Sequence, residues 1–62
     1  MKYNIGEFAI MNGTQWNGRI ACILSIASKQ EFPYKVAVMH SEDERFDTTL
    51  RVKESQLKEL YA

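Results

Sequence analysis

The chain has one cysteine, no net charge and no long apolar segment, and each shortage excludes a class of protein. Because Cys22 is alone, neither an intramolecular disulfide nor a zinc site built from paired cysteines can form. No segment approaches the roughly 20 apolar residues of a membrane span, and residues 1–7 lack the apolar region of a secretion signal. We therefore expect a cytoplasmic protein that does not associate with a membrane.

The balance of charge argues against strong binding to nucleic acid. Eight Lys and Arg residues offset eight Asp and Glu residues, so the formal charge is zero. No global field then attracts the molecule to phosphate or to an anionic membrane.

Hydrophobic residues make up 45% of the chain and charged residues 26%, which is typical of globular proteins. A chain of this length forms a single domain, residues 1–62, with one core.

Short strands separated by polar turns account for most of the chain. Four runs rich in apolar or β-branched residues predict strands: Gly6–Met11, Arg19–Ile26, Tyr34–Met39 and Thr48–Val52. The third run alternates cleanly, which predicts that Tyr34, Val36 and Val38 are buried. The opposite face is expected to be wet, and it carries Lys35, Ala37 and Met39. The charged segment 41–45 is expected to be a hairpin tip.

The last segment, Lys53–Tyr61, has two interpretations. Its Glu, Gln, Lys and Leu residues favour a helix by intrinsic propensity, although so short a helix needs tertiary support. In the other interpretation, Glu54–Gln56 forms one helical turn and Leu57–Leu60 forms a closing strand. The sequence leaves both open.

The register of the first strand decides which of its side chains are available to a partner. If Ala9 and Met11 point inward, then Phe8 and Ile10 point outward, whereas the opposite register buries Phe8 and Ile10. We expect the first register, with a β-bulge in the three-residue gap between the second-strand isoleucines. The predicted core is Ile5, Ala9, Met11, Ile20, Ile23, Tyr34, Val36, Val38, Leu50, Val52, Leu57 and Leu60.

Four short motifs follow one another along the chain. They are Gly6-Glu7 at the first strand, Gly18-x-Ile20-x-x-Ile23 at the second, Phe32-Pro33-Tyr34-x-Val36-x-Val38 at the third and Val52-x-Glu54-x-Gln56-Leu57 at the end. In this order they resemble the SH3-like small barrels, which include the stromal barrel subunit of photosystem I, the barrels of nitrile hydratase and ferredoxin-thioredoxin reductase, and the type II dihydrofolate reductases. The resemblance covers Ile5 to Leu60. It implies an all-β fold, a five-stranded SH3-like barrel with one 3-10 turn before the last strand.

Reductase activity is not expected, because the residues that carry it in that family are absent. The catalytic strand of the type II reductases has a Val-Gln-Ile-Tyr segment, through which four chains form a pore for folate and nicotinamide cofactors. The corresponding positions here are Thr49, Leu50, Arg51 and Val52. The glutamine and the tyrosine are therefore missing, and we expect neither a cofactor nor an oligomeric enzyme of this type.

Other catalytic or metal-binding sites are also not expected. His40 is the only histidine and Cys22 lies in an apolar strand, where we expect it to be a buried small side chain. Neither forms a base and nucleophile pair. The acidic cluster at 42–44 and Asp47 lacks the oxygen spacing of a calcium loop. We expect no catalytic residue and no metal ligand.

The leading hypothesis is binding to another protein. An outward Phe8 and Ile10 form an apolar strip of the kind that marks a binding or self-association surface. Trp16 lies in the long loop after the first strand, where SH3-like barrels contact ligands, and it is either a contact residue or a lid on the core. The predicted partner-binding residues are Phe8, Ile10, Trp16, Asn17 and Phe32. Pairing into a homo-oligomer is a related hypothesis.

Two alternatives to protein binding remain on sequence grounds: a nucleic-acid or Tudor-like module and, less favoured, an oligomeric enzyme like the type II reductases. A nucleic-acid or Tudor-like module would use Trp16, Phe32 and Tyr34 for stacking or for a cation cage. Its small basic face would comprise Lys29, Lys35 and Arg51. For the leading hypothesis of protein binding, the small size of the chain suits a phage or mobile-element accessory protein that acts as an inhibitor or modulator of a host protein.

Overall fold

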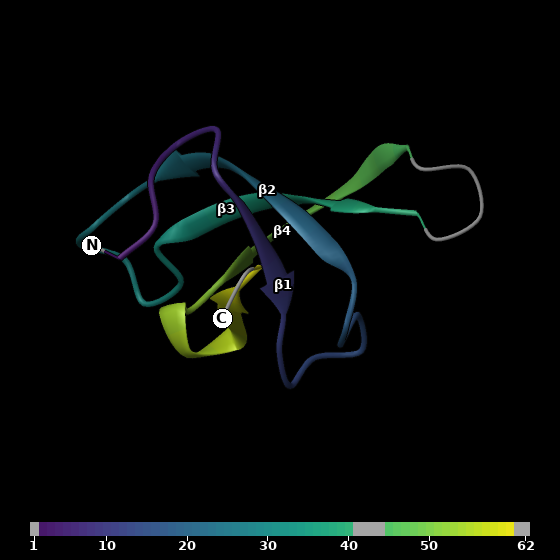
Figure 1. Cartoon of the computed structure of the whole chain (residues 1–62). Helices are drawn as coiled ribbons and strands as arrows, with labels where there is room; N and C mark the ends of the chain where they lie inside the picture. Colours follow the sequence, from purple (N-terminus) through teal and green to yellow (C-terminus); the bar gives the residue numbers. More distant parts are fainter. Residues whose placement is uncertain (1, 41–44, 61–62) are drawn as a thin grey trace.

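Five antiparallel strands form one sheet in the computed structural model (Figure 1). The strands are β1 Phe8–Met11, β2 Ile20–Ile26, β3 Tyr34–Met39, β4 Phe46–Val52 and β5 Leu57–Glu59, in the spatial order β4-β3-β2-β1-β5. A 3-10 turn, η1 Glu54–Gln56, connects β4 to β5. The prediction of a turn followed by a closing strand is therefore confirmed, and the alternative of a C-terminal helix is wrong.

The structure describes residues 2–40 and 45–60, apart from the side chain of Asp47. Residues 41–44 of the expected hairpin tip, with most of its acidic cluster, lie outside these ranges.

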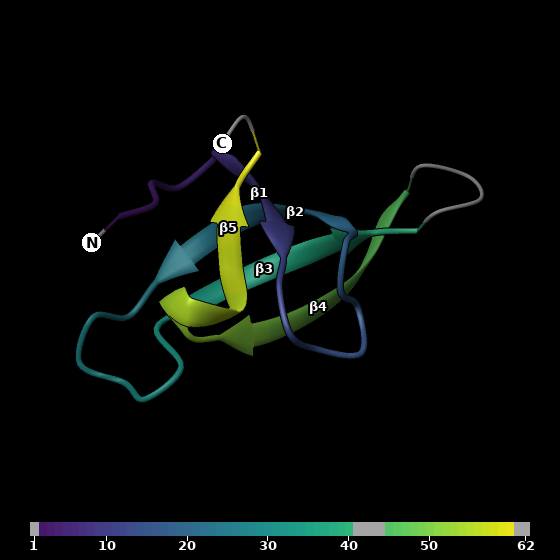
Figure 2. The same cartoon turned by 60° about the horizontal axis from the view of Figure 1, so that its bottom comes forward.

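The sheet curls so that its two ends share one core. In Figure 2, β5 crosses in front of β3. Met11 of β1 and Leu57 of β5 belong to the same buried cluster as Val36 of β3 and Val52 of β4. Within the described ranges, the hydrogen-bonded ladder runs from β4 to β5 through the other three strands and does not join β4 directly to β5. The fold is therefore an all-β, open and curled sheet.

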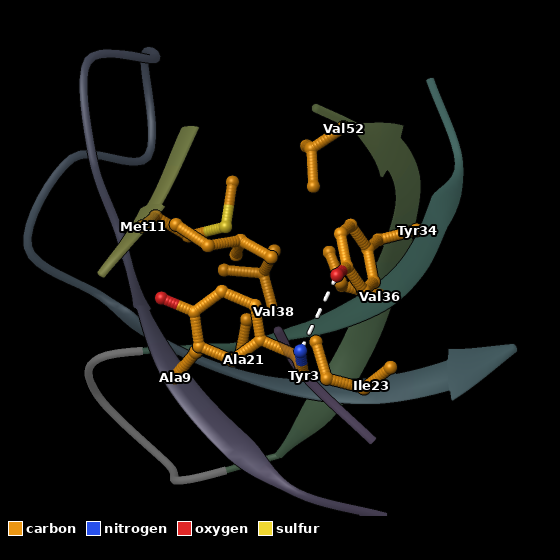
Figure 3. Close-up of a cluster of buried hydrophobic side chains, with 10 residues drawn as sticks. Tyr3, Ala9, Met11, Ala21, Ile23, Tyr34, Val36, Val38 and Val52 are labelled. Atoms are coloured by element: carbon orange, nitrogen blue, oxygen red, sulfur yellow. Dashed lines mark hydrogen bonds between the residues drawn. The ribbon is translucent and has the colours of Figure 1, made fainter. Parts of the chain in front are cut away.

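Burial confirms the predicted register of β1. Ala9 and Met11 are completely buried, whereas Phe8 is 46% exposed. Figure 3 shows how the inward side chains gather. The cluster contains Tyr3, Ala9, Met11, Ala21, Ile23, Tyr34, Val36, Val38, Val52 and Leu57. Most of the predicted core is present in this group.

Four residues of the predicted core are not fully buried, although one of them, Leu50, packs against the buried cluster. Ile5 is 66% exposed, in the turn before β1, and Ile20, Leu50 and Leu60 are only half-buried. β2 alternates regularly from Ile20 to Ile23, so Ile20 faces outward opposite Ile10 and Ala21 takes the inner position. The irregularity in register falls between Ile23 and Ser25. The bulge predicted between Ile20 and Ile23 is therefore wrong.

Tyr3 is a core residue that the sequence analysis missed. It is 1% exposed, and its ring meets the Tyr34 ring edge-on, with the centroids 5.7 Å apart. The Tyr3 backbone N–H donates a hydrogen bond to the Tyr34 hydroxyl oxygen at 3.3 Å (Figure 3). Lys2 continues this attachment, because its backbone N–H donates to Glu54 Oε1 at 3.0 Å. The N-terminal segment is thereby tied to β3 and to η1.

This attachment predicts a sensitivity to acid. Glu54 accepts hydrogen bonds from the Lys2 backbone and from the Tyr34 hydroxyl, and both lower the pKa of its carboxyl group below the ordinary 4.5. A pKa that is lower in the folded state contributes stability above the unfolded-state pKa and loses it as the pH falls through the folded-state value. We expect the melting temperature of the native protein to fall more between about pH 5 and pH 3 than that of Glu54→Gln.

The measurement is thermal unfolding followed by circular dichroism across this pH range. Glu31→Gln is the matched control, because the Glu31 carboxylate is exposed and lies 4.0 Å from Lys53 Nζ in a weak surface pair. It should retain the native pH profile. Parallel profiles for the native protein and Glu54→Gln would contradict the role of Glu54.

Candidate interaction surface

The outer face of the sheet carries adjoining uncharged side chains. Register partners lie on the same face of a sheet, and Phe8 faces Cys22, which in turn faces Ala37. Alongside this row, Ile10 faces Ile20 on β2. At the far side of the sheet Met39 faces Phe46. We call these seven side chains the outer patch: Phe8, Ile10, Ile20, Cys22, Ala37, Met39 and Phe46.

Two exposed phenylalanines meet across the outer patch. The ring centroids of Phe8 and Phe46 are 5.9 Å apart, although β2 and β3 separate their strands. On β2 and β3, the residues in register with Phe8 are Cys22 and Ala37. Their side chains are small, so they leave room for the two rings to approach each other. Ala37 is only 5% exposed. The prediction that this face of β3 is wet is therefore wrong at Ala37, because larger side chains surround it.

A bulge in β4 directs Phe46 to this surface. Val38 pairs with Thr48, and Met39 pairs with Phe46, so Asp47 is an extra residue in β4. Thr48 pairs with the buried Val38 and so lies on the inner face, and strict alternation would place Phe46 on that face too. The extra residue between them moves the Phe46 side chain to the outer face. Phe46 is 39% exposed as a result. Sequence reasoning missed Phe46 because no local signal in the chain indicates this bulge.

Charged side chains border the outer patch. Lys58 faces Ile10 at the β5 side, and Lys35 faces Arg51 beyond the row of Phe8. The Arg51 guanidinium is held in place, since it donates to the backbone oxygens of Phe32 and Pro33 at 3.1 and 3.4 Å. An apolar centre with a polar rim is the usual composition of a protein interface.

The loop between β1 and β2 is held together by its own polar groups. The Gly13 N–H donates to Asn17 Oδ1 at 2.8 Å, and the Trp16 N–H donates to Thr14 Oγ1 at 3.0 Å. Gly18 closes the loop with a φ of 89°, a conformation that favours glycine, while its N–H donates to Met11 O at 2.8 Å. Asn17, one of the predicted contact residues, therefore builds the loop.

Trp16 covers part of the core. It is half-buried and packs against the buried cluster. The Arg19 guanidinium carbon lies 5.3 Å from the centroid of the Trp16 ring, in a cation–π contact. These contacts favour the lid interpretation of Trp16.

The predicted contact residues do not form one surface. Phe8 and Ile10 share the outer patch, whereas Trp16 and Phe32 lie in loops that leave opposite ends of β2 (Figure 2). Phe32 is 40% exposed, with Lys53 Nζ 5.3 Å from its ring centroid. Tyr34 is fully buried. Trp16, Phe32 and Tyr34 therefore do not form one aromatic site.

An open pocket lies beside the outer patch, where β1 and β5 run next to each other. It has a volume of about 420 Å³ and is lined by Glu7, Phe8, Glu59 and Leu60.

The predicted buried position of Cys22 is wrong, since Cys22 is half-buried on the outer face opposite Phe8. In the described ranges, no three His, Cys, Asp or Glu side chains are grouped to hold a metal ion.

Two further observations bear on function. Among residues 2–40 and 45–60, no helix is long and apolar enough to cross a membrane. Comparisons of the chain with protein-family models, with curated proteins and with solved structures found no match. The functional interpretation therefore depends on the geometry of the chain itself.

Proposed function

We propose that this protein is a small non-catalytic binding module that captures another protein through the outer patch. The observation that carries the proposal is the Phe8–Phe46 ring pair, in which both residues are more than one third exposed within the uncharged outer patch. Large aromatic side chains contribute much of the energy of protein interfaces. Covering this face with a partner removes apolar surface from water, which favours association.

The proposal includes an SH3-like barrel and a cytoplasmic setting. The strand order β4-β3-β2-β1-β5, with a 3-10 turn before the last strand, supports the resemblance to SH3-like barrels. The lone Cys22 is suited to a reducing compartment. A phage or mobile-element accessory protein that inhibits or modulates a host protein is the biological role we propose for so small a module.

Capture of partners from a lysate of the native host, followed by mass spectrometry, tests the proposal. The tagged native protein is compared with the double variant Phe8→Ser, Ile10→Thr. We expect the variant to fold and to lose at least about tenfold in recovery of the partner, because truncation of a central aromatic side chain costs that much affinity or more. Circular dichroism of the variant shows whether the fold is retained.

Phe32→Ser is the matched control for this experiment. It also removes an exposed phenylalanine, but from the loop between β2 and β3, so we expect recovery of the partner to be unchanged. A folded double variant that recovers the partner as well as the native protein would reject the outer patch as the binding surface.

Self-association through the outer patch is tested separately. Light scattering over a concentration series measures the molecular mass of the protein in solution. A homodimer that dissociates in the double variant would replace the external partner with a second copy. Recovery of RNA in place of protein, with an affinity that falls steeply with salt, would favour the nucleic-acid alternative.

A further inference from the structure

We infer that the partner captured by the outer patch is an acidic protein segment, in which aspartate or glutamate side chains flank apolar ones. This inference rests on the proposed function, since it names the chemistry of the partner of the same surface. It follows from the charges beside the outer patch. The strand register places three basic side chains, Lys35, Arg51 and Lys58, on the outer face of the sheet.

The three cations lie on two sides of the outer patch. Lys58 on β5 is in register with Ile10 on β1, and neighbouring strands are about 4.8 Å apart. On β3, Lys35 is two residues from Ala37, which corresponds to about 7 Å along the strand. Arg51 on β4 is in register with Lys35. A segment that covers the outer patch therefore meets positive charge on either side of it.

These cations have no carboxylate partner in the part of the chain that the structure describes. The carboxylates of residues 2–40 and 45–60 whose side chains are described make other contacts: Glu31 with Lys53, Glu59 with Lys2, and Glu7 and Glu54 with backbone N–H groups. None of them pairs with Lys35, Arg51 or Lys58. The positive charge beside the outer patch is therefore available to a partner.

Lys35 and Arg51 form a like-charged pair on adjacent strands. Like charges directly opposite each other destabilise a sheet, so a carboxylate beside both of them relieves this repulsion. The Arg51 guanidinium is already oriented, because it donates to the backbone oxygens of Phe32 and Pro33. A group that is ordered before binding loses less conformational entropy on binding. Ser25, in register with Lys35, adds a hydroxyl group to the same row.

A protein segment fits this surface better than a nucleic acid does. Lys35 and Arg51 belong to the basic face that the nucleic-acid alternative requires, but Lys29 lies outside the sheet, in the loop between β2 and β3. A phosphate backbone laid over the outer patch would lose hydration without gaining hydrogen bonds there. An acidic segment supplies apolar side chains for the patch and carboxylates for the cations. A second copy of the chain would bring like charges together, which opposes self-association.

The experiment is an NMR titration of the full chain with the peptide Glu-Glu-Leu-Phe-Leu-Glu-Glu, acetylated and amidated at its ends. We expect amide shifts at residues 8–10, 20–22, 35–39, 49–51 and 58, with an affinity that falls as salt screens the charges. The peptide with glutamine in place of glutamate should bind at least about fivefold more weakly, because several exposed ion pairs are lost. The peptide Glu-Glu-Gly-Ser-Gly-Glu-Glu should also bind more weakly, because it cannot cover the patch.

Three results of this titration would overturn the inference. The first is equal binding of the glutamine peptide. The second is equal or stronger binding of a peptide with lysine in place of glutamate. The third is tighter binding of a uridine oligonucleotide than of the acidic peptide, which would favour the nucleic-acid alternative.

Substitution of the two lysines gives a second readout. Lys35→Gln and Lys58→Gln should each weaken binding of the glutamate peptide about two- to fivefold, the usual range for one exposed ion pair. Binding of the glutamine peptide should not change. Lys2→Gln is the matched control, because Lys2 is also exposed but contacts Glu59, which is in register with the inward Ala9. Unchanged binding of the glutamate peptide to both outer-face variants would contradict the inference.

Partner capture separates this inference from the proposed function. If the double variant Phe8→Ser, Ile10→Thr captures the partner normally, the outer patch and the acidic segment are both rejected. If capture depends on the patch but the combined variant Lys35→Gln, Lys58→Gln captures the partner as well as the native protein does, only the acidic segment is rejected. Loss of capture in both variants supports both proposals.

Discussion

Replacing Ile23 with alanine is expected to lower the free energy of unfolding by about 2–5 kcal/mol. Ile23 is 1% exposed and belongs to the buried cluster. Truncation removes buried apolar surface and leaves a cavity that the surrounding strands fill only in part. A domain of this length has a total stability of about 3–9 kcal/mol, so the loss is a large part of the whole.

Thermal and urea unfolding measure this effect. One kcal/mol shifts the melting temperature of a small domain by about 4–8 °C, so we expect Ile23→Ala to melt at least about 8 °C below the native protein. The backbone of Ile23 is hydrogen-bonded to Gly6 and Glu7, and alanine retains both bonds. The change therefore reports on side-chain packing alone.

Leu24→Ala is the matched control, because it removes a side chain of the same size from the neighbouring position. Leu24 is 41% exposed, at the irregular register between Ile23 and Ser25. We expect its loss of stability to be within about 0.5–1 kcal/mol. Equal destabilisation by both substitutions would contradict the observed direction of the side chains in β2.

The same substitution at two touching tyrosines is expected to have opposite effects. Tyr34→Phe should destabilise the fold by about 1–3 kcal/mol, because the Tyr34 hydroxyl accepts the buried Tyr3 N–H and donates to Glu54 Oε1. Its removal leaves that N–H unpaired. Tyr3→Phe should stabilise the fold by about 1 kcal/mol, because the Tyr3 hydroxyl is buried and has no hydrogen-bond partner among the described residues.

Urea unfolding of the two single variants tests these signs, and each variant is the control for the other. Both lose one oxygen from rings whose centroids are 5.7 Å apart, so apolar packing is nearly unchanged. A stabilised Tyr34→Phe or a destabilised Tyr3→Phe would contradict the hydrogen bonding described for this pair.

Alkaline pH should reveal the same buried hydroxyl. Burial raises the pKa of Tyr3 above its ordinary 10.0, because the phenolate loses its hydration. With the folded-state pKa above the unfolded one, the stability is full below about pH 10 and is lost as the pH rises through the folded-state value. Tyr3→Phe should lose less stability than the native protein over this range.

Local periodicity in the sequence was sufficient to predict most of the strands. Tyr34–Met39 has the same bounds in the structure as its alternation predicts. Ala9 and Met11 are buried and Phe8 is exposed, as the period of two residues in β1 requires. Phe8 and Ile10 could therefore be identified as outward residues before the structure was known.

Bulges and long-range contacts could not be predicted in this way. An extra residue in one strand is defined only by its pairing with another, so the reversal of Phe46 at Asp47 is invisible in the local pattern. Tyr3 lies in a polar N-terminal segment and becomes buried by joining the core cluster, where it contacts Tyr34, which is 31 residues away. The pocket at Glu7 and Glu59 likewise needs the two ends of the chain side by side.

The sequence by itself determined most of the strands and the inward face of β1, because these follow from the spacing of apolar residues along one segment. The tertiary structure alone decided that Phe46 meets Phe8 and that two distant glutamates share a pocket. These contacts depend on the order and register of paired strands, which the free energy of the whole sheet selects.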